Sequence, residues 1–115
     1  MTGRTLFPRF SDAEYARRHQ GIRRAMAQEG LDAIVIVGGV GAPEVPYLIN
    51  YIPQMPCWLV FPQEGDATCF LHFHNHIPCA REQAIIKDIQ WYGPSPTKTV
   101  ADHLKERGLG HSRIG

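Results

Sequence analysis

The sequence predicts an α/β domain in which helices cover both faces of one sheet. An amphipathic helix that begins near Ser11 is followed by Gly30 and then by an unalternating apolar strand, LDAIVIVGG. A strand that reads as a continuous apolar run is buried on both faces, so a layer is needed on each side of its sheet. The length of 115 residues suits one compact domain and hardly two. We therefore expect a single domain over residues 1–115.

The bulk composition excludes several classes of partner. Twelve Lys and Arg face eleven Asp and Glu, and this near-balance predicts no nucleic-acid partner, because phosphate binding needs a basic surplus. The longest apolar run, AIVIV at 33–37, is too short to span a bilayer, so no membrane partner is expected. The N-terminus lacks the pattern of a signal peptide, and three cysteines without a CxxC pair indicate reduced thiols. A cytoplasmic location is predicted.

Residues 11–29 are expected to form the first helix. Ser11 can cap it, Glu14 can complete a capping box, and Phe10 can pack on Tyr15. Gly30 is placed to end it in a left-handed turn. Four residues recur at steps of three and four and predict the buried face: Tyr15, His19, Ile22 and Met26. His19 is therefore interpreted as a core histidine, and the four arginines of the helix as a solvated face.

The rest of the chain alternates loops, strands and helices. Prolines in residues 40–56 predict a short helical turn around YLINYI, set in loop. CWLVFP and ATCFLHF flank QEGD and predict a hairpin with Gly65 in the turn. PCAREQAII reads as a short helix and DIQWYG as a strand. A last helix is expected after a cap at Thr97 or Thr99, with a stop at Gly108. SRIG reads as the start of a further strand, so we expect a longer parent protein.

Three histidines at every second position raise the question of a metal site. On a strand His72, His74 and His76 would share one face, with neighbours about 6.7 Å apart, so adjacent members could converge on zinc. The run lacks the Asp of an H-x-H-x-D-H pattern, and no H-E-x-x-H lies nearby. Three interpretations stay open: a metal site, a hydrogen-bonded strand end, and a loop that meets a ligand or partner.

The order of these elements resembles a known family. The stretches that carry the resemblance are FSDAEYARRHQGIRRAMAQEGLDAIVI, VPYLINY, CWLVFPQEGDATCF and RIG. Together they span residues 10–115 and resemble the N-terminal domain of the creatinase, aminopeptidase P and prolidase family, the "pita-bread" metallohydrolases. The resemblance implies a single layered α/β domain of ribonuclease H-like topology, with a mixed sheet flanked by helices.

The resemblance also implies a division of labour. In the family the divalent metal pair and its ligands belong to a C-terminal catalytic domain, and no residue here matches those ligands. The chain is thus expected to be a non-catalytic domain without a cofactor of its own, whereas the full-length protein would be a metal-dependent hydrolase of the Xaa-Pro peptidase or creatinase type. Its expected partners are its own catalytic domain and a second copy in a homodimer. Its expected roles are oligomerisation and enclosure of the active site.

Candidate site residues follow from the same resemblance. In creatinase-like members the segment after the Tyr-Leu pair carries substrate-contacting aromatic and arginine side chains. The matching NYIPQMP at 50–56 is shorter and has no Arg, which favours an Xaa-Pro peptidase-like parent over a creatine-binding one. The residues expected to face substrate or partner are Asn50, Tyr51, Gln54, His74 and His76. The rival hypothesis is a free-standing small metal- or ligand-binding α/β protein that uses His72, His74 and His76.

Overall fold

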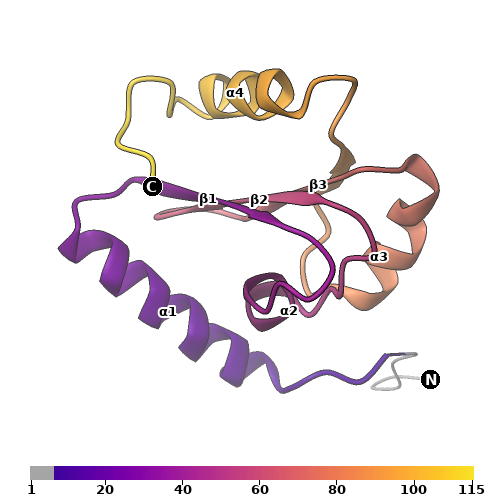
Figure 1. Ribbon diagram of the computed structural model, residues 1–115. Coiled ribbons are helices and arrows are strands. Elements are labelled where there is room, and N and C mark those ends of the chain that lie inside the picture. The colour runs from indigo at the N-terminus through magenta and orange to yellow at the C-terminus, as the bar shows by residue number, and fades with distance from the viewer. Residues whose placement is uncertain (1–6) are drawn as a thin grey trace.

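The computed structural model describes residues 7–115 and shows a four-stranded sheet between two layers of helices (Figure 1). In chain order the elements are α1 (Asp12–Gln28), β1 (Ala33–Gly38), α2 (Glu44–Ile49), β2 (Cys57–Pro62), β3 (Thr68–Leu71), the 3₁₀ turn η1 (His74–His76), α3 (Ile77–Gln83), β4 (Ile89–Trp91) and α4 (Pro96–Glu106). The predicted α/β class is confirmed.

The strands lie in the order β1-β2-β3-β4. β1 with β2 and β2 with β3 are antiparallel, while β3 and β4 are parallel, so the predicted mixed sheet is confirmed. The β2–β3 connection is the predicted hairpin, and Gly65 in its turn has φ 93°. Figure 1 shows α4 on one side of the sheet and α1 and α2 on the other. α3 packs on the same side as α1 and α2, as shown by its residue Ala80, which belongs to the core that these helices share with the sheet.

The outer edge of β1 is only partly paired. Residues 113–115 lie parallel to its first half: Asp32 N donates to Arg113 O (2.8 Å), Gly115 N to Ala33 O (2.9 Å), and Val35 N to Gly115 O (2.9 Å). The strand start predicted at SRIG is therefore confirmed as a short bridge. Beyond Val35 this edge has no strand partner among residues 7–115.

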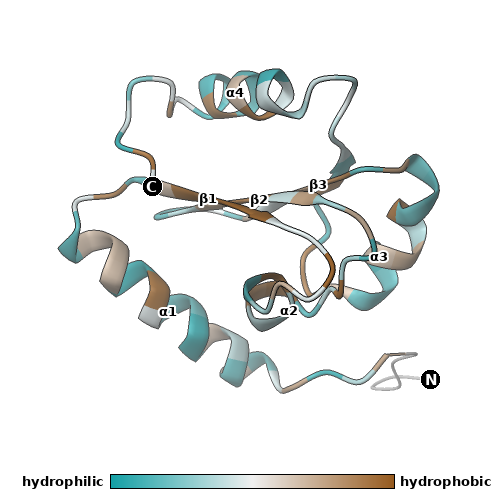
Figure 2. Ribbon diagram, viewed as in Figure 1, coloured by the Kyte–Doolittle hydropathy of each residue, from teal (hydrophilic) through white to brown (hydrophobic). Residues whose placement is uncertain are grey.

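Two hydrophobic cores hold the layers together. The larger lies between the sheet and α1, α2 and α3, and is built on Leu59, Phe61 and Leu71. The smaller lies between the sheet and α4, and is built on Val60, Phe70 and Val100. Figure 2 shows the corresponding hydrophobic colouring along the central strands. Within residues 7–115, no helix is long and apolar enough to cross a membrane.

The beginning of α1 differs in one respect from the sequence prediction. Ser11 Oγ accepts a hydrogen bond from Glu14 N (3.2 Å), and Phe10 packs edge-on against Tyr15 (6.3 Å between ring centroids), as predicted. The Glu14 carboxylate instead accepts from the guanidinium groups of Arg17 and Arg18. The capping box is thus only half formed, because two cations one turn away compete for its carboxylate.

The arginines of α1 are not all solvated, which corrects the sequence prediction. Arg18 is only 12% exposed: its guanidinium lies between the rings of Phe10 and Tyr47, and donates to Tyr47 O (2.9 Å). Arg23 donates to Pro62 O and Gly65 O, so it holds the hairpin turn. Periodicity placed these two side chains on the polar side because it cannot show which elements lie beside the helix.

Two other local predictions for α1 are confirmed, one at its C-terminal end and one at His19. Gly30 has φ 68°, and Leu31 N donates to Met26 O (2.8 Å), which is the left-handed helix end expected there. His19 is half-buried, its Nε2 lies 2.7 Å from Leu48 O, and its ring packs on Phe61, as expected of a core histidine.

α4 begins earlier than predicted. Its N-cap is Ser95, and Pro96 is in the first turn, so neither Thr97 nor Thr99 caps it. Proline suits the first helical position because its φ is preset and its missing N–H needs no partner there. Gly108, with φ 77°, lies just beyond the helix end, as predicted.

We predict that Arg18 stabilises the packing of α1 on α2. Replacing Arg18 by Ala removes hydrogen bonds to Glu14 and Tyr47 and the contacts with aromatic rings, and should lower the free energy of unfolding by about 2 kcal/mol. Arg17 is the matched control, since it also pairs with Glu14 but is largely exposed, and Arg17→Ala should cost less than about 0.5 kcal/mol. Urea unfolding measures both. Equal losses would contradict the proposed role of Arg18.

We predict a pH-dependent contact between α4 and the sheet. Burial against Phe70 lowers the pKa of His103; Arg107 lowers it further, and Asp88 and Glu106 oppose the shift. A histidine whose folded pKa is lowered contributes full stability above the pKa of the unfolded chain, about 6.5, and loses it as the pH falls below that value. Urea unfolding at several pH values should therefore show a loss below about pH 6.5 that His103→Leu reduces. Exposed His111 is the control, and His111→Leu should retain the loss. A loss of the same size in His103→Leu would disprove the assignment.

Candidate functional site

Three of the five predicted site residues line the same cavity. Tyr51, Gln54 and His76 surround a pocket of about 160 Å³, which lies between the loop after α2 and the η1–α3 segment. The remaining lining residues are Ile52, Asn75, Cys79 and Gln83. Asn50 lies beside this cavity and His74 lies outside it.

Asn50 fixes the loop that forms one wall of the cavity. It ends α2 in the left-handed conformation, with φ 61°, which an asparagine tolerates. Its Nδ2 donates to Pro8 O (3.0 Å) and to Gln83 O (3.1 Å). Gln83 Oε1 in turn accepts from Ile52 N (2.8 Å), so the loop and α3 are joined in both directions. Asn50 thus positions the cavity wall.

Tyr51 is a neutral group at the base of the cavity. Its side chain is buried, and burial together with the nearby cysteines raises its pKa to about 12. A phenol with this pKa stays protonated near neutral pH, so it can donate a hydrogen bond but cannot act as a base. A hydrogen bond with Cys57 and burial raise the pKa of Cys69, so that thiol is also neutral. Cys79, which lines the cavity, is exposed, and all three cysteines are free, as predicted.

The histidine run does not form a strand, so the prediction of one shared face is wrong. β3 ends at Leu71, where Tyr92 N makes the last ladder hydrogen bond, and residues 74–76 turn into η1 ahead of Pro78. A 3₁₀ turn points residues two apart in different directions. The histidines accordingly have different neighbours. His72, just before the turn, is hydrogen-bonded through Nδ1 with the hydroxyl of Tyr92, whereas the ring of His74 lies over Trp91 (4.2 Å between centroids, 31° between planes).

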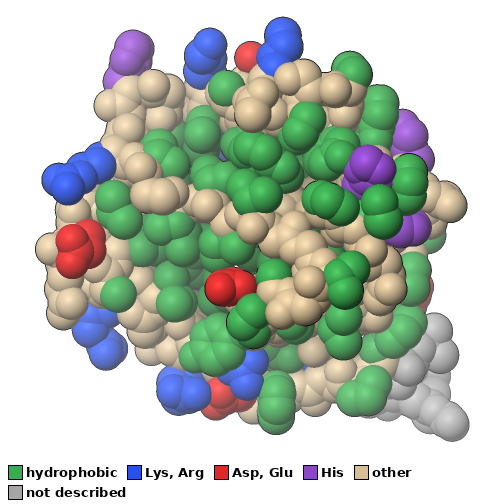
Figure 3. All heavy atoms as spheres, viewed as in Figure 1, with side chains coloured by type: hydrophobic (Ala, Val, Ile, Leu, Met, Phe, Trp, Pro, Cys, Tyr) green, Lys and Arg blue, Asp and Glu red, His purple; other side chains and the backbone are tan. Residues whose placement is uncertain are grey.

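His76 packs edge-on against Phe73 at 5.2 Å, and Phe73 contacts His72. These ring contacts form two groups, which the hydrogen bond from Trp91 to His72 O joins into what we call the histidine–aromatic cluster: His72, Phe73, His74, His76, Trp91 and Tyr92. Phe73 is 43% and Trp91 38% exposed, so the cluster has an apolar surface that faces solvent. Figure 3 shows histidine side chains among apolar ones at this end of the molecule.

Sequence reasoning did not select the aromatic members of this cluster. Trp91 comes from β4 and donates through Nε1 to His72 O (3.0 Å). The sequence signal for Trp91 was the alternation in IQWY, which places Trp91 on the face opposite to Gln90 and Tyr92. This alternation does not show that β4 lies beside β3, which is what brings Trp91 to the histidines.

The structure does not group the three histidines as ligands of one metal ion. Among the described residues, no three His, Cys, Asp or Glu side chains are grouped so that they could hold a metal ion. The ring of Phe73 separates His72 from His76, and His74 lies over Trp91, so this arrangement gives no support to the metal-binding rival.

With this geometry established, the comparisons identify the family. A family model for the creatinase/prolidase N-terminal domain matches residues 18–115. The chain belongs to that family. No curated protein matches the sequence at a significant level. The family assigned by resemblance from the sequence is thereby confirmed.

Two solved structures are similar to the chain. One is an Xxa-Pro aminopeptidase from Streptococcus pyogenes, with 17% identity and a TM-score of 0.68 over 86% of this chain and 71% of the other. The other is dipeptidase PepE from Mycobacterium ulcerans, with 27% identity and a TM-score of 0.67 over 85% of this chain. The chain spans 28% of the length of that dipeptidase. The first likeness supports the fold alone.

We predict that Asn50 holds the cavity wall through two separable effects. Asn50→Gly keeps the left-handed backbone but loses the hydrogen bonds to Pro8 and Gln83, and should lower the free energy of unfolding by about 1–2 kcal/mol. Asn50→Ala adds the strain of a left-handed L-residue, about 1 kcal/mol more. Urea unfolding distinguishes the two variants. If alanine proved no worse than glycine, the backbone constraint at residue 50 would be refuted.

Proposed function

We propose that this chain acts as the non-catalytic N-terminal part of an Xaa-Pro dipeptidase, an aminopeptidase P or a creatinase-like metallohydrolase, and serves assembly and enclosure of the active site. The observation that carries the proposal is the family match over residues 18–115. The similar dipeptidase has a chain far longer than this one, which supports a catalytic part elsewhere in the parent protein.

The titratable groups favour a non-catalytic role for this domain. The parent enzyme would hold a divalent metal pair, but the described residues do not fit it, because they offer no cluster of three potential ligands. The cavity at Tyr51 contains a phenol that stays neutral, and although His76 and Cys79 both line it, no hydrogen bond joins this imidazole and thiol among residues 7–115, so no activated nucleophile is formed.

Enclosure of the active site is assigned to the end of the molecule that bears the cavity and the histidine–aromatic cluster. The two are continuous, because His76 lines the cavity and also contacts Phe73 of the cluster. Exposed aromatic rings next to polar groups suit contact with a peptide or a neighbouring subunit. On this proposal Tyr51, Gln54, His74 and His76 face the substrate or partner, and Asn50 positions them.

Assembly is assigned to the free edge of β1. A groove of about 440 Å³ runs beside this edge on the α1–α2 side, and its lining is almost wholly apolar: Ile22, Ile34, Ile36, Pro43, Glu44, Tyr47 and Leu48. On the other side of the sheet Val37 is 59% exposed. Figure 3, which views this edge, shows apolar side chains over much of the face. An open strand edge with apolar flanks is a surface that a homodimer would bury.

We predict that the purified chain self-associates through this edge. Sedimentation equilibrium should show a mass that rises with concentration, and Val37→Lys should shift the equilibrium towards monomer, since a charged lysine on an edge opposes strand pairing. Ala101→Lys adds the same charge at an exposed position of α4 and should leave association unchanged. A clean monomer at high concentration, or an equal effect of both variants, would disprove the assembly role.

A further inference from the structure

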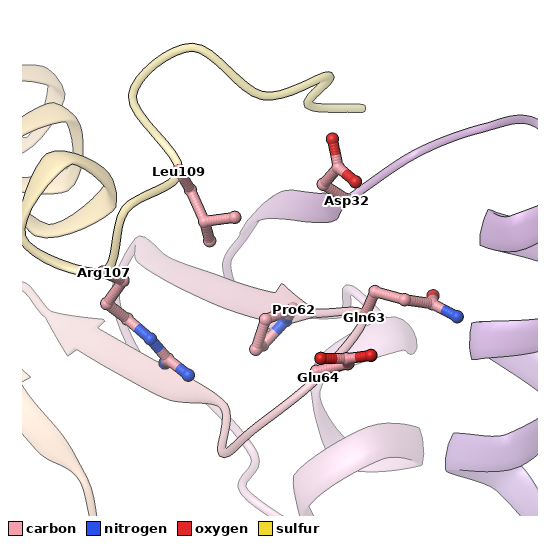
Figure 4. A pocket seen from close by; sticks show the side chains of 6 residues that line it. All are labelled: Asp32, Pro62, Gln63, Glu64, Arg107 and Leu109. Atoms are coloured by element: carbon pink, nitrogen blue, oxygen red, sulfur yellow. The ribbon is translucent and has the colours of Figure 1, made fainter.

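A second pocket, distant from the histidine–aromatic cluster, has a lining of mixed charge. It encloses about 350 Å³ between the end of β2, the hairpin turn and the residues after α4. Its lining residues are Asp32, Pro62, Gln63, Glu64, Arg107 and Leu109. This volume lies within the range of small-molecule sites. Figure 4 shows Pro62 between the Arg107 guanidinium and the Glu64 carboxylate, with Leu109 and Asp32 above them in the view.

The charged groups of this pocket are left available for a ligand. Within the part of the chain that the structure describes, Glu64 forms no ion pair and no side-chain hydrogen bond, and Asp32 forms no ion pair. Arg107 uses one N–H to donate to Asp66 O (2.5 Å). A guanidinium carries five N–H donors, so Arg107 retains donors for a carboxylate.

The positions of these groups are fixed by the fold. Gln63 N donates to Asp32 O (2.8 Å), and Asp32 Oδ2 accepts from Arg113 N (3.0 Å), so the Asp32 carboxylate is held by the backbone. Arg107 lies against the hairpin turn, where a Cβ added to Gly65 would come within 2.7 Å of its Nη2. The positive φ of Gly65 favours glycine there, and the hydrogen bond from Arg107 to Asp66 O holds the guanidinium beside the turn.

We infer that this pocket binds a small zwitterion, a free α-amino acid with an apolar side chain. Arg107 would bind its carboxylate, because guanidinium and carboxylate match in a two-bond fork. Glu64 would bind its ammonium group. Pro62 and Leu109 supply the apolar surface against which the side chain would lie. The site is independent of the proposed assembly and enclosure roles.

The test uses ligands that carry one charge or both. In ¹H–¹⁵N spectra of the purified chain, L-leucine should cause saturable shifts of the amides of Gln63, Glu64 and Leu109. 4-Methylpentanoate, which lacks the ammonium group, and isoamylamine, which lacks the carboxylate, should each bind at least about tenfold more weakly, because each loses one charged contact. If either bound as tightly as leucine, or if leucine gave no saturable shift at these amides, the inference would be overturned.

Two conservative variants separate the contacts. Glu64→Gln should weaken leucine binding about tenfold and leave 4-methylpentanoate binding unchanged, since only the ammonium contact is lost. Arg107→Lys keeps the charge but loses the fork, and should weaken leucine and 4-methylpentanoate alike. Glu82→Gln, at an exposed position of α3, is the matched control and should leave every titration unchanged. Leucine binding that Glu64→Gln leaves unchanged, or that Glu82→Gln weakens to the same degree, would also overturn the inference.

Discussion

The burial of β2 and β3 on both faces is the constraint on which the rest of the structure depends. Five of the six residues of β2 and all four of β3 are buried. Side chains of a strand alternate between the two faces of its sheet, so full burial needs an apolar layer above and another below. α1, α2 and α3 supply one layer and α4 supplies the other. The helices and the loops between them therefore have to place one layer against each face of the β2–β3 hairpin.

The hairpin turn is where the two layers meet. Arg23 from α1 donates to carbonyl groups of Pro62 and Gly65, and Arg107, just after α4, donates to Asp66 O. Both side chains place their guanidinium groups on backbone oxygens, and that of Arg23 also lies over the ring of Phe61. The contact of Arg107 with Asp66 O also holds its guanidinium in the lining of the mixed-charge pocket. Arg107 therefore both holds the hairpin turn and lines the proposed binding site.

The proposed roles are carried by separate parts of the surface. The loop after α2, η1 and β4 form one end, with the small cavity and the histidine–aromatic cluster. The edge of β1 forms another face, with an apolar groove and Val37 beside a half-paired strand. Two findings support these proposed roles. The chain belongs to the creatinase/prolidase N-terminal domain family, and the similar dipeptidase is a much longer chain.

The sequence by itself determined the elements that local chemistry controls. Ser11 begins α1, Gly30 ends it and Gly65 closes the hairpin, because each depends on the backbone preference of one residue and its near neighbours. The quoted stretches were also enough for the family. Only the tertiary structure decided the fate of the histidine run, since the end of β3 is set by β4, which comes some twenty residues later. The roles of Arg18, Arg107 and Trp91 were likewise decided there: their partners lie far away in sequence, and side-chain periodicity contains no information about which elements become neighbours.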